Sequence, residues 1–179
     1  MRSLLTVLFF IIALSVFGQR AGSVSVSEFG AVPDSHQDAT AAIAKALAYC
    51  KKNSVAKLIF PKGQYDLYPE KAIKKEYFIS NTSTEEECPS KIKTIGILLE
   101  GMNDFTIEGN GSMLLYHGKM ISFVIDNCRD ITIKNLAVDY ARPTMSEFTI
   151  VSATNKAIEA RVHPDSWFKI ESDKLVWYG

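Results

Sequence analysis

Ile95-Gly96-Ile97-Leu98-Leu99 and Asn103-Asp104-Phe105-Thr106-Ile107 are matched 26 residues later by Ile121-Ser122-Phe123-Val124-Ile125 and Arg129-Asp130-Ile131-Thr132-Ile133. A fixed period of about 20–30 residues with short β-rich runs is typical of a solenoid. Turn residues separate the runs, and neither unit carries a helical pattern. This combination favours a parallel β-helix over a leucine-rich or helical array. A generic β-sandwich is the alternative.

The turns between these runs repeat as well. Asp104 and Asp130 each precede a strand, where we expect their side chains to bond turn backbone. The 26-residue offset also sets Gly109-Asn110 against Asn135-Leu136.

Composition places the chain among ordinary globular proteins. Its 179 residues are 47% hydrophobic and 22% charged, with a formal net charge of zero. No basic stripe of the kind that nucleic-acid binding requires is present. No polybasic cluster suggests a membrane surface, so we expect neither partner.

Residues 1–18 have the pattern of a signal peptide. Arg2 precedes an apolar run from Leu4 to Phe17, which is short for a membrane span. We place the cleavage after Gly18, with an uncleaved N-terminal anchor as the alternative. The mature chain is therefore expected to be exported, to the periplasm or the extracellular space, and free of the membrane.

The chain has three cysteines, Cys50, Cys88 and Cys128. An odd number leaves at least one unpaired in an exported chain, and the spacing matches no zinc site. We interpret all three as structural or incidental, with a single disulfide as the alternative.

The N-terminal third predicts a short strand, a helix and a strand pair. Residues 24–31 alternate and turn at Gly30, and Asp38 is placed to cap a helix over 39–52. Small apolar residues follow one face of that helix, so it can cover the open first coil of a β-helix. An ordinary α+β helix packed on a sheet is the alternative. Strands are then expected over 57–60, 64–67 and 77–80.

The repeat ends at Pro143. Residues 147–153 and 157–162 alternate around a turn, which predicts an antiparallel hairpin. We divide the mature chain into cap and first coils over 19–142 and an antiparallel insertion over 143–179. Two coils without a closing cap predict the N-terminal fragment of a longer protein.

Several segments resemble known proteins. The opening resembles the pectate-lyase-like superfamily of right-handed β-helices, through Ser27-Glu28-Phe29-Gly30-Ala31 and Ile59-Phe60-Pro61-Lys62-Gly63-Gln64-Tyr65. More specific segments resemble glycoside hydrolase family 110, the bacterial exo-α-1,3-galactosidases: residues 76–81, 97–102, 105–112, 116–121 and 138–143, with the hairpin and 157–170.

The resemblance implies a right-handed β-helix and hydrolysis of terminal α-1,3-linked galactose with inversion. Inversion requires one carboxylic acid and one carboxylate on opposite sides of the scissile bond. The acidic cluster of the family lies beyond position 179, so no catalytic residue is assigned and the fragment itself is expected to be inactive. The implied partner is a glycan with terminal galactose, without cofactor or metal.

Three residues are candidates for substrate binding. Asp139 and Arg142 lie at the end of a coil, where charged groups can hold sugar hydroxyls, and His117 lies in a coil turn. The alternatives are a surface ion pair or turn residues for the first two and a hydrogen-bonded turn histidine for the third. Trp167, Trp177 and Tyr178 fit strand packing better than sugar stacking. A non-catalytic carbohydrate-binding or scaffold module is the second possible function.

Overall fold

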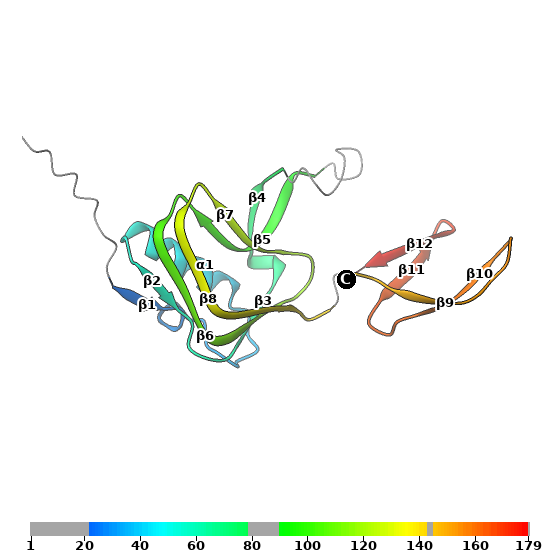
Figure 1. Ribbon diagram of the computed structural model, residues 1–179, viewed down its shortest axis with the longest axis horizontal. Coiled ribbons are helices and arrows are strands. Elements are labelled where there is room, and N and C mark those ends of the chain that lie inside the picture. The colour runs from blue at the N-terminus through cyan, green and yellow to red at the C-terminus, as the bar shows by residue number, and fades with distance from the viewer. Residues whose placement is uncertain (1–21, 79–89, 143–144, 179) are drawn as a thin grey trace, which may run out of the picture.

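The computed structural model describes residues 22–78, 90–142 and 145–178, and Figure 1 shows their arrangement. The first elements are β1 (Ser23–Ser25), the 3₁₀ helix η1 (Val26–Phe29), α1 (Thr40–Lys52), β2 (Lys57–Ile59), β3 (Gln64–Leu67), the 3₁₀ helix η2 (Pro69–Lys71) and β4 (Ile73–Glu76). The rest are β5 (Ile92–Glu100), β6 (Asn103–Tyr116), β7 (Ile121–Asp126), β8 (Arg129–Tyr140), β9 (Phe148–Ala153), β10 (Ile158–Val162), β11 (Trp167–Glu171) and β12 (Lys174–Tyr178).

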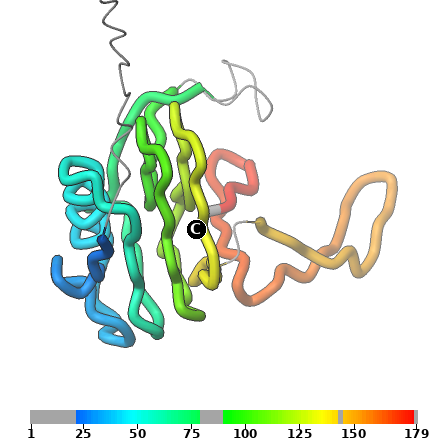
Figure 2. The backbone as a smooth tube through the Cα atoms, turned by 60° about the vertical axis from the view of Figure 1, so that its left-hand side comes forward, coloured from blue at the N-terminus to red at the C-terminus, as the bar shows by residue number. Residues whose placement is uncertain are grey.

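The chain winds so that strands of successive coils stack in parallel. One sheet has the order β1-β2-β6-β3, with β8 also paired to β6, and every pairing in it is parallel. In a second sheet β5 pairs with β7 in parallel and with β4 in antiparallel. Figure 2 shows β6 and β8 running side by side. The structure thus confirms a mostly β chain built on parallel pairing.

The predicted 26-residue register is confirmed over the first part of each coil. Ile97 lies opposite Phe123, and Ile107 lies opposite Ile133. The alignment of Gly109-Asn110 with Asn135-Leu136 is wrong, because Leu136 lies opposite Ser112. The corner within β6 consists of residues 109–111, whereas the corresponding corner within β8 consists of Asn135 alone.

The repeated acidic residues occupy positions where the backbone is left-handed. Asp104 and Asp130 have φ of 50° and 54°, in the left-handed region that Asp and Asn tolerate better than most residues. The Asp130 carboxylate lies 3.5 Å from Nε of its neighbour Arg129. Within the described residues, Asp130 does not form the side-chain bond to turn backbone that we expected.

The interior of the coils is filled by alternate strand residues and by large aromatic rings. The largest fully buried side chains are Tyr65, Tyr116, Phe60, Phe105, Ile43, Leu58, Leu67, Ile95, Ile97, Leu99, Met102 and Ile107. Tyr116 Oη donates to the carbonyl of Ser122 at 2.9 Å, and Tyr65 Oη donates to that of Pro61 at 2.7 Å. These bonds let two polar rings stay in an apolar core.

The N-terminal strand is shorter than the alternating pattern predicts. β1 ends at Ser25, because Ser25 and Glu28 form a reciprocal capping box that starts η1. The helix begins at Thr40, one residue later than predicted, so Ala39 and not Asp38 is its N-cap. Asp38 Oδ1 still accepts from the Thr40 backbone N–H at 2.9 Å. α1 packs against η1, β1, β2 and β5, at the end of the stack away from β8 (Figure 2).

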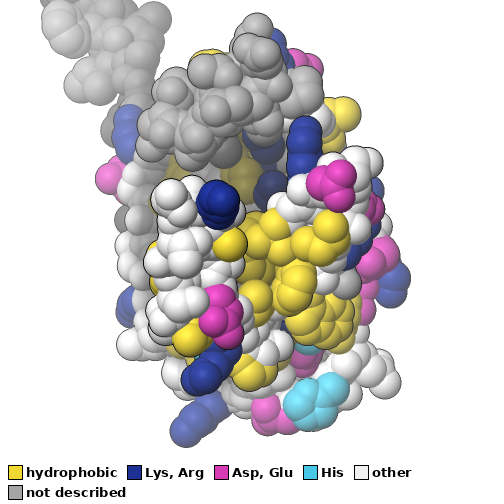
Figure 3. Space-filling view, turned by 90° about the vertical axis from the view of Figure 1, so that its right-hand side faces the viewer, with side chains coloured by type: hydrophobic (Ala, Val, Ile, Leu, Met, Phe, Trp, Pro, Cys, Tyr) yellow, Lys and Arg dark blue, Asp and Glu magenta, His cyan; other side chains and the backbone are white. Residues whose placement is uncertain are grey.

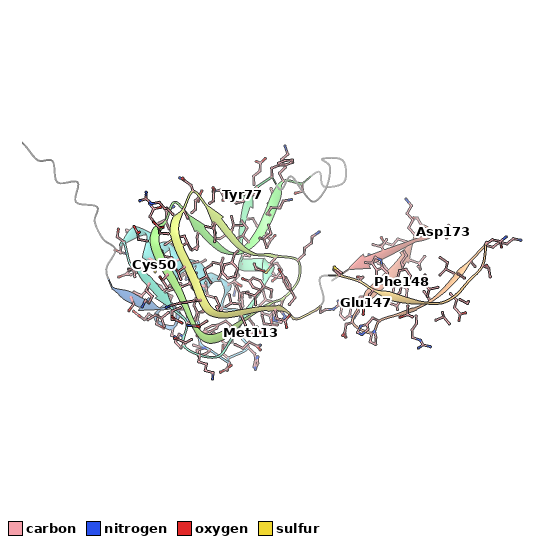
Figure 4. The ribbon with its side chains drawn as sticks, viewed as in Figure 1. Cys50, Tyr77, Met113, Glu147, Phe148 and Asp173 are labelled. Atoms are coloured by element: carbon pink, nitrogen blue, oxygen red, sulfur yellow. The ribbon has the colours of Figure 1, made fainter. Side chains whose placement is uncertain are left out.

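Some predicted features lie elsewhere or outside the described residues. The strand expected over 77–80 is found earlier, as β4 (Ile73–Glu76), where it pairs with β5; residues 79–80 lie outside the description. The segment 1–18 and Cys88 also lie outside it. Cys50 is buried on α1 (Figure 4), and Cys128 Sγ accepts from the Met102 backbone N–H at 3.4 Å.

The residues after β8 form an arm of two antiparallel hairpins, β9–β10 and β11–β12. The arm projects from the coils in Figure 1, and Phe148 and Asp173 are labelled on it in Figure 4. Its exposed large apolar side chains are Met145, Phe148, Ile150, Val151, Ile158, Trp167, Phe168, Ile170 and Leu175. Hydrophobic side chains gather on the face that Figure 3 shows. Two-stranded ribbons bury too little to be stable by themselves.

Glu108 links the corners of two coils and gives the fold an acid-sensitive contact. Its carboxylate accepts from the Asn135 side chain at 2.8 Å and the Asn110 backbone N–H at 3.2 Å, and Lys134 Nζ lies 3.3 Å away. The bonds from Asn135 and Asn110, with a smaller one from Lys134, hold the pKa of Glu108 below its ordinary value against the effect of burial.

A carboxyl with a lowered folded-state pKa stabilises the fold above its unfolded pKa of about 4.3, and this contribution is lost as the pH falls through the folded value. As the pH is lowered from about 5, we expect Glu108→Gln to lose less stability than the parent does. Urea midpoints at several pH values measure this, with Glu147→Gln on the arm as control. Parallel acid profiles for parent and Glu108→Gln would show the prediction wrong.

Candidate functional site

One corner of the coils carries two long excursions on either side of a short turn. The chain leaves the stack after β3 to make η2 and β4, and it leaves again after β8 to make the arm. Between them, the turn after β6 spans only residues 117–120. Long excursions from a rigid scaffold are where binding residues concentrate. This corner is therefore the candidate functional site.

Asp66, on β3, is a buried carboxylate at this corner. Its Oδ1 lies 2.7 Å from His117 Nε2, and its Oδ2 lies 3.6 Å from His36 Nδ1. Gln64 Nε2 donates to both oxygens, at 3.3 and 3.2 Å. A buried carboxylate needs such donors to offset its lost hydration.

His117 is held on two sides. Its Nε2 bonds Asp66, and its ring stacks on Tyr68 with a centroid distance of 4.1 Å and an interplanar angle of 4°. Its backbone N–H donates to the carbonyl of Leu67 at 2.8 Å. The ring is thus fixed in position and in plane while its side chain stays 27% exposed.

Tyr68 is itself fixed to the start of α1. Its backbone N–H donates to Thr40 Oγ1 at 2.8 Å, and that hydroxyl donates to the Tyr68 carbonyl at 3.3 Å. On the same side, Lys71 Nζ lies 3.3 Å from Asp38 Oδ2. The corner is therefore rigid where Tyr68, Asp66 and His117 meet.

The other two candidates lie at the end of β8 and just after it, beside the end of β6, and their side-chain hydrogen bonds within the described residues go to residues other than His117. Asp139 is exposed, and its Oδ1 accepts from the backbone N–H of Tyr140 at 2.8 Å. Arg142 turns to the arm, where it donates to the carbonyl of Asp165 at 2.6 Å and its guanidinium lies 3.7 Å from the Trp167 ring centroid. The expected alternative, an ion pair between Asp139 and Arg142, is not formed in the part of the chain that the structure describes.

The aromatic residues of the arm divide between packing and exposure. Trp177 is half-buried against Phe148 and Phe168, at centroid distances of 6.3 and 5.9 Å. Trp167 packs against the Arg142 guanidinium, although 53% of this residue is exposed. The side chain of Tyr178 lies outside the description.

Sequence reasoning missed Asp66, Tyr68 and His36. One signal was available, because Asp66 interrupts the otherwise apolar run from Tyr65 to Leu67 in a strand buried on both faces. A charged residue at such a position needs a specific partner. Its identity, 51 residues away at His117, is not visible in any local pattern.

The chain matches the family described as rhamnogalacturonase A/epimerase, pectate lyase-like, over residues 23–160. It is 42% identical to alpha-1,3-galactosidase A of Bacteroides fragilis over 170 residues, which cover 95% of this chain and 28% of that protein. It is 38% identical to alpha-1,3-galactosidase B of Bacteroides thetaiotaomicron over 157 residues, covering 87% and 25%. The chain spans about a quarter of the length of these curated relatives. Among the described residues, no helix is both long and apolar enough to span a membrane.

Proposed function

We propose that this chain is the N-terminal part of an exported glycoside hydrolase. The chain belongs to the family described as rhamnogalacturonase A/epimerase, pectate lyase-like. This enzyme would remove terminal α-1,3-linked galactose from glycans. The observation that carries the proposal is the 42% identity to alpha-1,3-galactosidase A along almost the whole chain. Fold alone would not select this activity, since β-helices of one architecture support many reactions.

Apolar side chains on β7 and β8 are more exposed than their partners one coil earlier, which is evidence for further coils. Leu99 and Leu114 are fully buried, whereas their partners one coil later, Ile125 and Val138, are 52% and 39% exposed. In a solenoid each unit buries its apolar face only against a neighbour. We propose that additional coils of the enzyme stack on β7 and β8 and cover these residues.

The proposed reaction proceeds with inversion. One carboxylic acid protonates the leaving oxygen, and a carboxylate on the other side of the sugar activates water. We assign neither role within this chain and place both on the further coils. Asp139, Arg142 and His117 are proposed as glycan contacts at the corner beside the arm.

A chimera tests the proposal. Residues 19–179 replace the matching segment of the Bacteroides fragilis alpha-1,3-galactosidase A, and galactose release from α-1,3-galactobiose is followed by NMR. We expect a rate of the same order as the parent enzyme, with β-galactose as the first product. The parent without its N-terminal segment is the negative control. A folded but inactive chimera, or α-galactose as the first product, would contradict the proposal.

Non-catalytic carbohydrate binding is the second candidate, and the exposed Trp167 on the arm favours it. Indole faces are large rigid surfaces on which apolar ligand faces pack. Glycan binding by the 179-residue chain, together with an inactive chimera, would favour this function over the first.

A further inference from the structure

We propose that His117 binds a hydroxyl group of a neutral glycan through its Nδ1 atom, and that Asp66 is the positioning residue that sets this atom as an acceptor. The choice of galactosides as ligand rests on the proposed function. The site itself rests on the geometry of the corner formed by Asp66, Tyr68 and His117.

Asp66 determines which nitrogen of the His117 ring carries the proton. A carboxylate only accepts hydrogen bonds, so at 2.7 Å from Asp66 Oδ1 the Nε2 atom of His117 must carry its proton. In the neutral imidazole the other nitrogen is then an acceptor. Asp66 therefore selects the tautomer in which Nδ1 presents a lone pair.

The lone pair of His117 Nδ1 reaches solvent. Nδ1 of His117 has no hydrogen-bond partner within the described ranges 22–78, 90–142 and 145–178. In the same ranges, no buried side-chain nitrogen or oxygen atom lacks a partner. Nδ1 is therefore accessible from outside, consistent with the 27% exposure of the side chain.

The His117 ring is preorganised for a ligand. The Asp66 bond fixes the rotation of the ring, the coplanar stack on Tyr68 fixes its plane, and the turn backbone is bonded to β3. A side chain that is already ordered loses little conformational entropy when a ligand arrives. A histidine that merely tied two coils together would need the Nε2 bond and no accessible second nitrogen.

The charges around the pair favour a neutral ligand. His36 faces the other oxygen of Asp66 from the loop before α1, and Lys71 is engaged by Asp38. An anion such as sulfate has no proton to donate to Nδ1, whereas a sugar hydroxyl has one. The hydroxyl groups of a galactoside therefore fit this acceptor.

Side-chain ¹⁵N NMR of the 179-residue chain at pH 8 tests the inference directly, with α-1,3-galactobiose as the probe. We expect His117 in the Nε2–H tautomer and a saturable shift of its Nδ1 signal on titration. In Asp66→Asn, which removes the charge that selects the tautomer, we expect the two ring nitrogens to become more alike and the affinity to fall. A purely structural bond would leave the galactobiose affinity unchanged.

Two variants separate ligand contact from stability. His117→Gln places an amide N–H near the former Nε2 and keeps a donor to Asp66, but it removes the Nδ1 acceptor. We expect a chain that stays folded, with a urea midpoint lowered only by the lost stack on Tyr68, and about tenfold weaker galactobiose binding, the effect of one hydrogen bond. His163→Gln, on the arm, is the matched control and should bind as the parent does.

Three results would overturn the inference. They are binding that leaves the His117 signals unmoved, equal affinity of His117→Gln and parent, and no response to galactobiose at any soluble concentration. A response to sulfate but not to galactobiose counts with the third. The galactosidase proposal would survive all of them, because the chimera measures it separately.

Discussion

Tyr116→Ala is expected to lower the free energy of unfolding by about 3 to 5 kcal/mol, the range for deleting a large buried ring. Tyr116 is the last residue of β6, and its side chain is fully buried, with its hydroxyl bonded to Ser122 on β7. It also occupies the space that a side chain at position 96 would need, since a Cβ on Gly96 would lie 2.3 Å from Tyr116 Cε1. Such a loss is a large part of the roughly 5 to 15 kcal/mol of a typical domain.

Tyr116→Phe is the matched control for this variant. It keeps the ring and removes only the hydrogen bond from Oη to the Ser122 carbonyl, so we expect a loss of about 1 kcal/mol. Urea unfolding followed by circular dichroism measures both variants. Equal losses for Ala and Phe would mean that the ring contributes nothing beyond its hydroxyl, against the packing argument.

The same hydroxyl has a spectroscopic signature. Burial, and to a lesser extent the neighbouring Tyr140, raises the pKa of Tyr116 well above its usual range. We therefore expect its phenolate absorbance to appear only when the chain unfolds in alkali. This reports on the same packed ring that the alanine variant removes.

The repeat made the core of this fold predictable from sequence. Strand partners in stacked coils occupy equivalent positions, so the match of Ile107 with Ile133 translated directly into their pairing. The left-handed residues at the corners, such as Asp104 and Asp130, recur for the same reason. Periodicity carries this information because each coil faces the same environment as the one before it.

Local competition explains the errors in the strands. The alternating run that starts at Val24 looks like a strand up to Ala31, but the capping box between Ser25 and Glu28 starts a 3₁₀ turn after three strand residues. Nothing in the sequence around Gly109 predicts that the corner of its coil has two more residues than the corner of the next coil. Hydrophobic patterns do not register a bulge that keeps the alternation on both sides.

The candidate site was less predictable, because its members come from different coils. His117 could be picked out as a turn histidine, but its anchor Asp66 belongs to an earlier strand. His117 and Asp66 come together only because successive coils stack on one another. The charge of Arg142 makes it a binding candidate, but its guanidinium lies over the Trp167 ring of the arm. Pairings across coils depend on register, which a single sequence fixes only where it repeats.

Gly109→Ala is expected to cost about 1 to 3 kcal/mol of unfolding free energy, the range for an added group in a packed site. A Cβ at this position would lie 2.3 Å from the carbonyl oxygen of Asn135. Backbone of the next coil cannot move aside as a flexible side chain would, so β6 and β8 must separate locally. This separation disturbs the corner where the Glu108 carboxylate accepts a hydrogen bond from the Asn135 side-chain amide.

Gly111→Ala separates this clash from backbone strain. Gly111 has φ of 79° and nothing within 4 Å of an added Cβ, so its variant pays only for the left-handed conformation, about 1 kcal/mol. Hydrogen exchange distinguishes the two further. Gly109→Ala should speed exchange at the β8 amides around Asn135, whereas Gly111→Ala should leave them protected. If the Gly109 variant kept full protection in β8, the coils would not be in the close contact that their register requires, and the proposed stacking of further coils on β8 would lose its template.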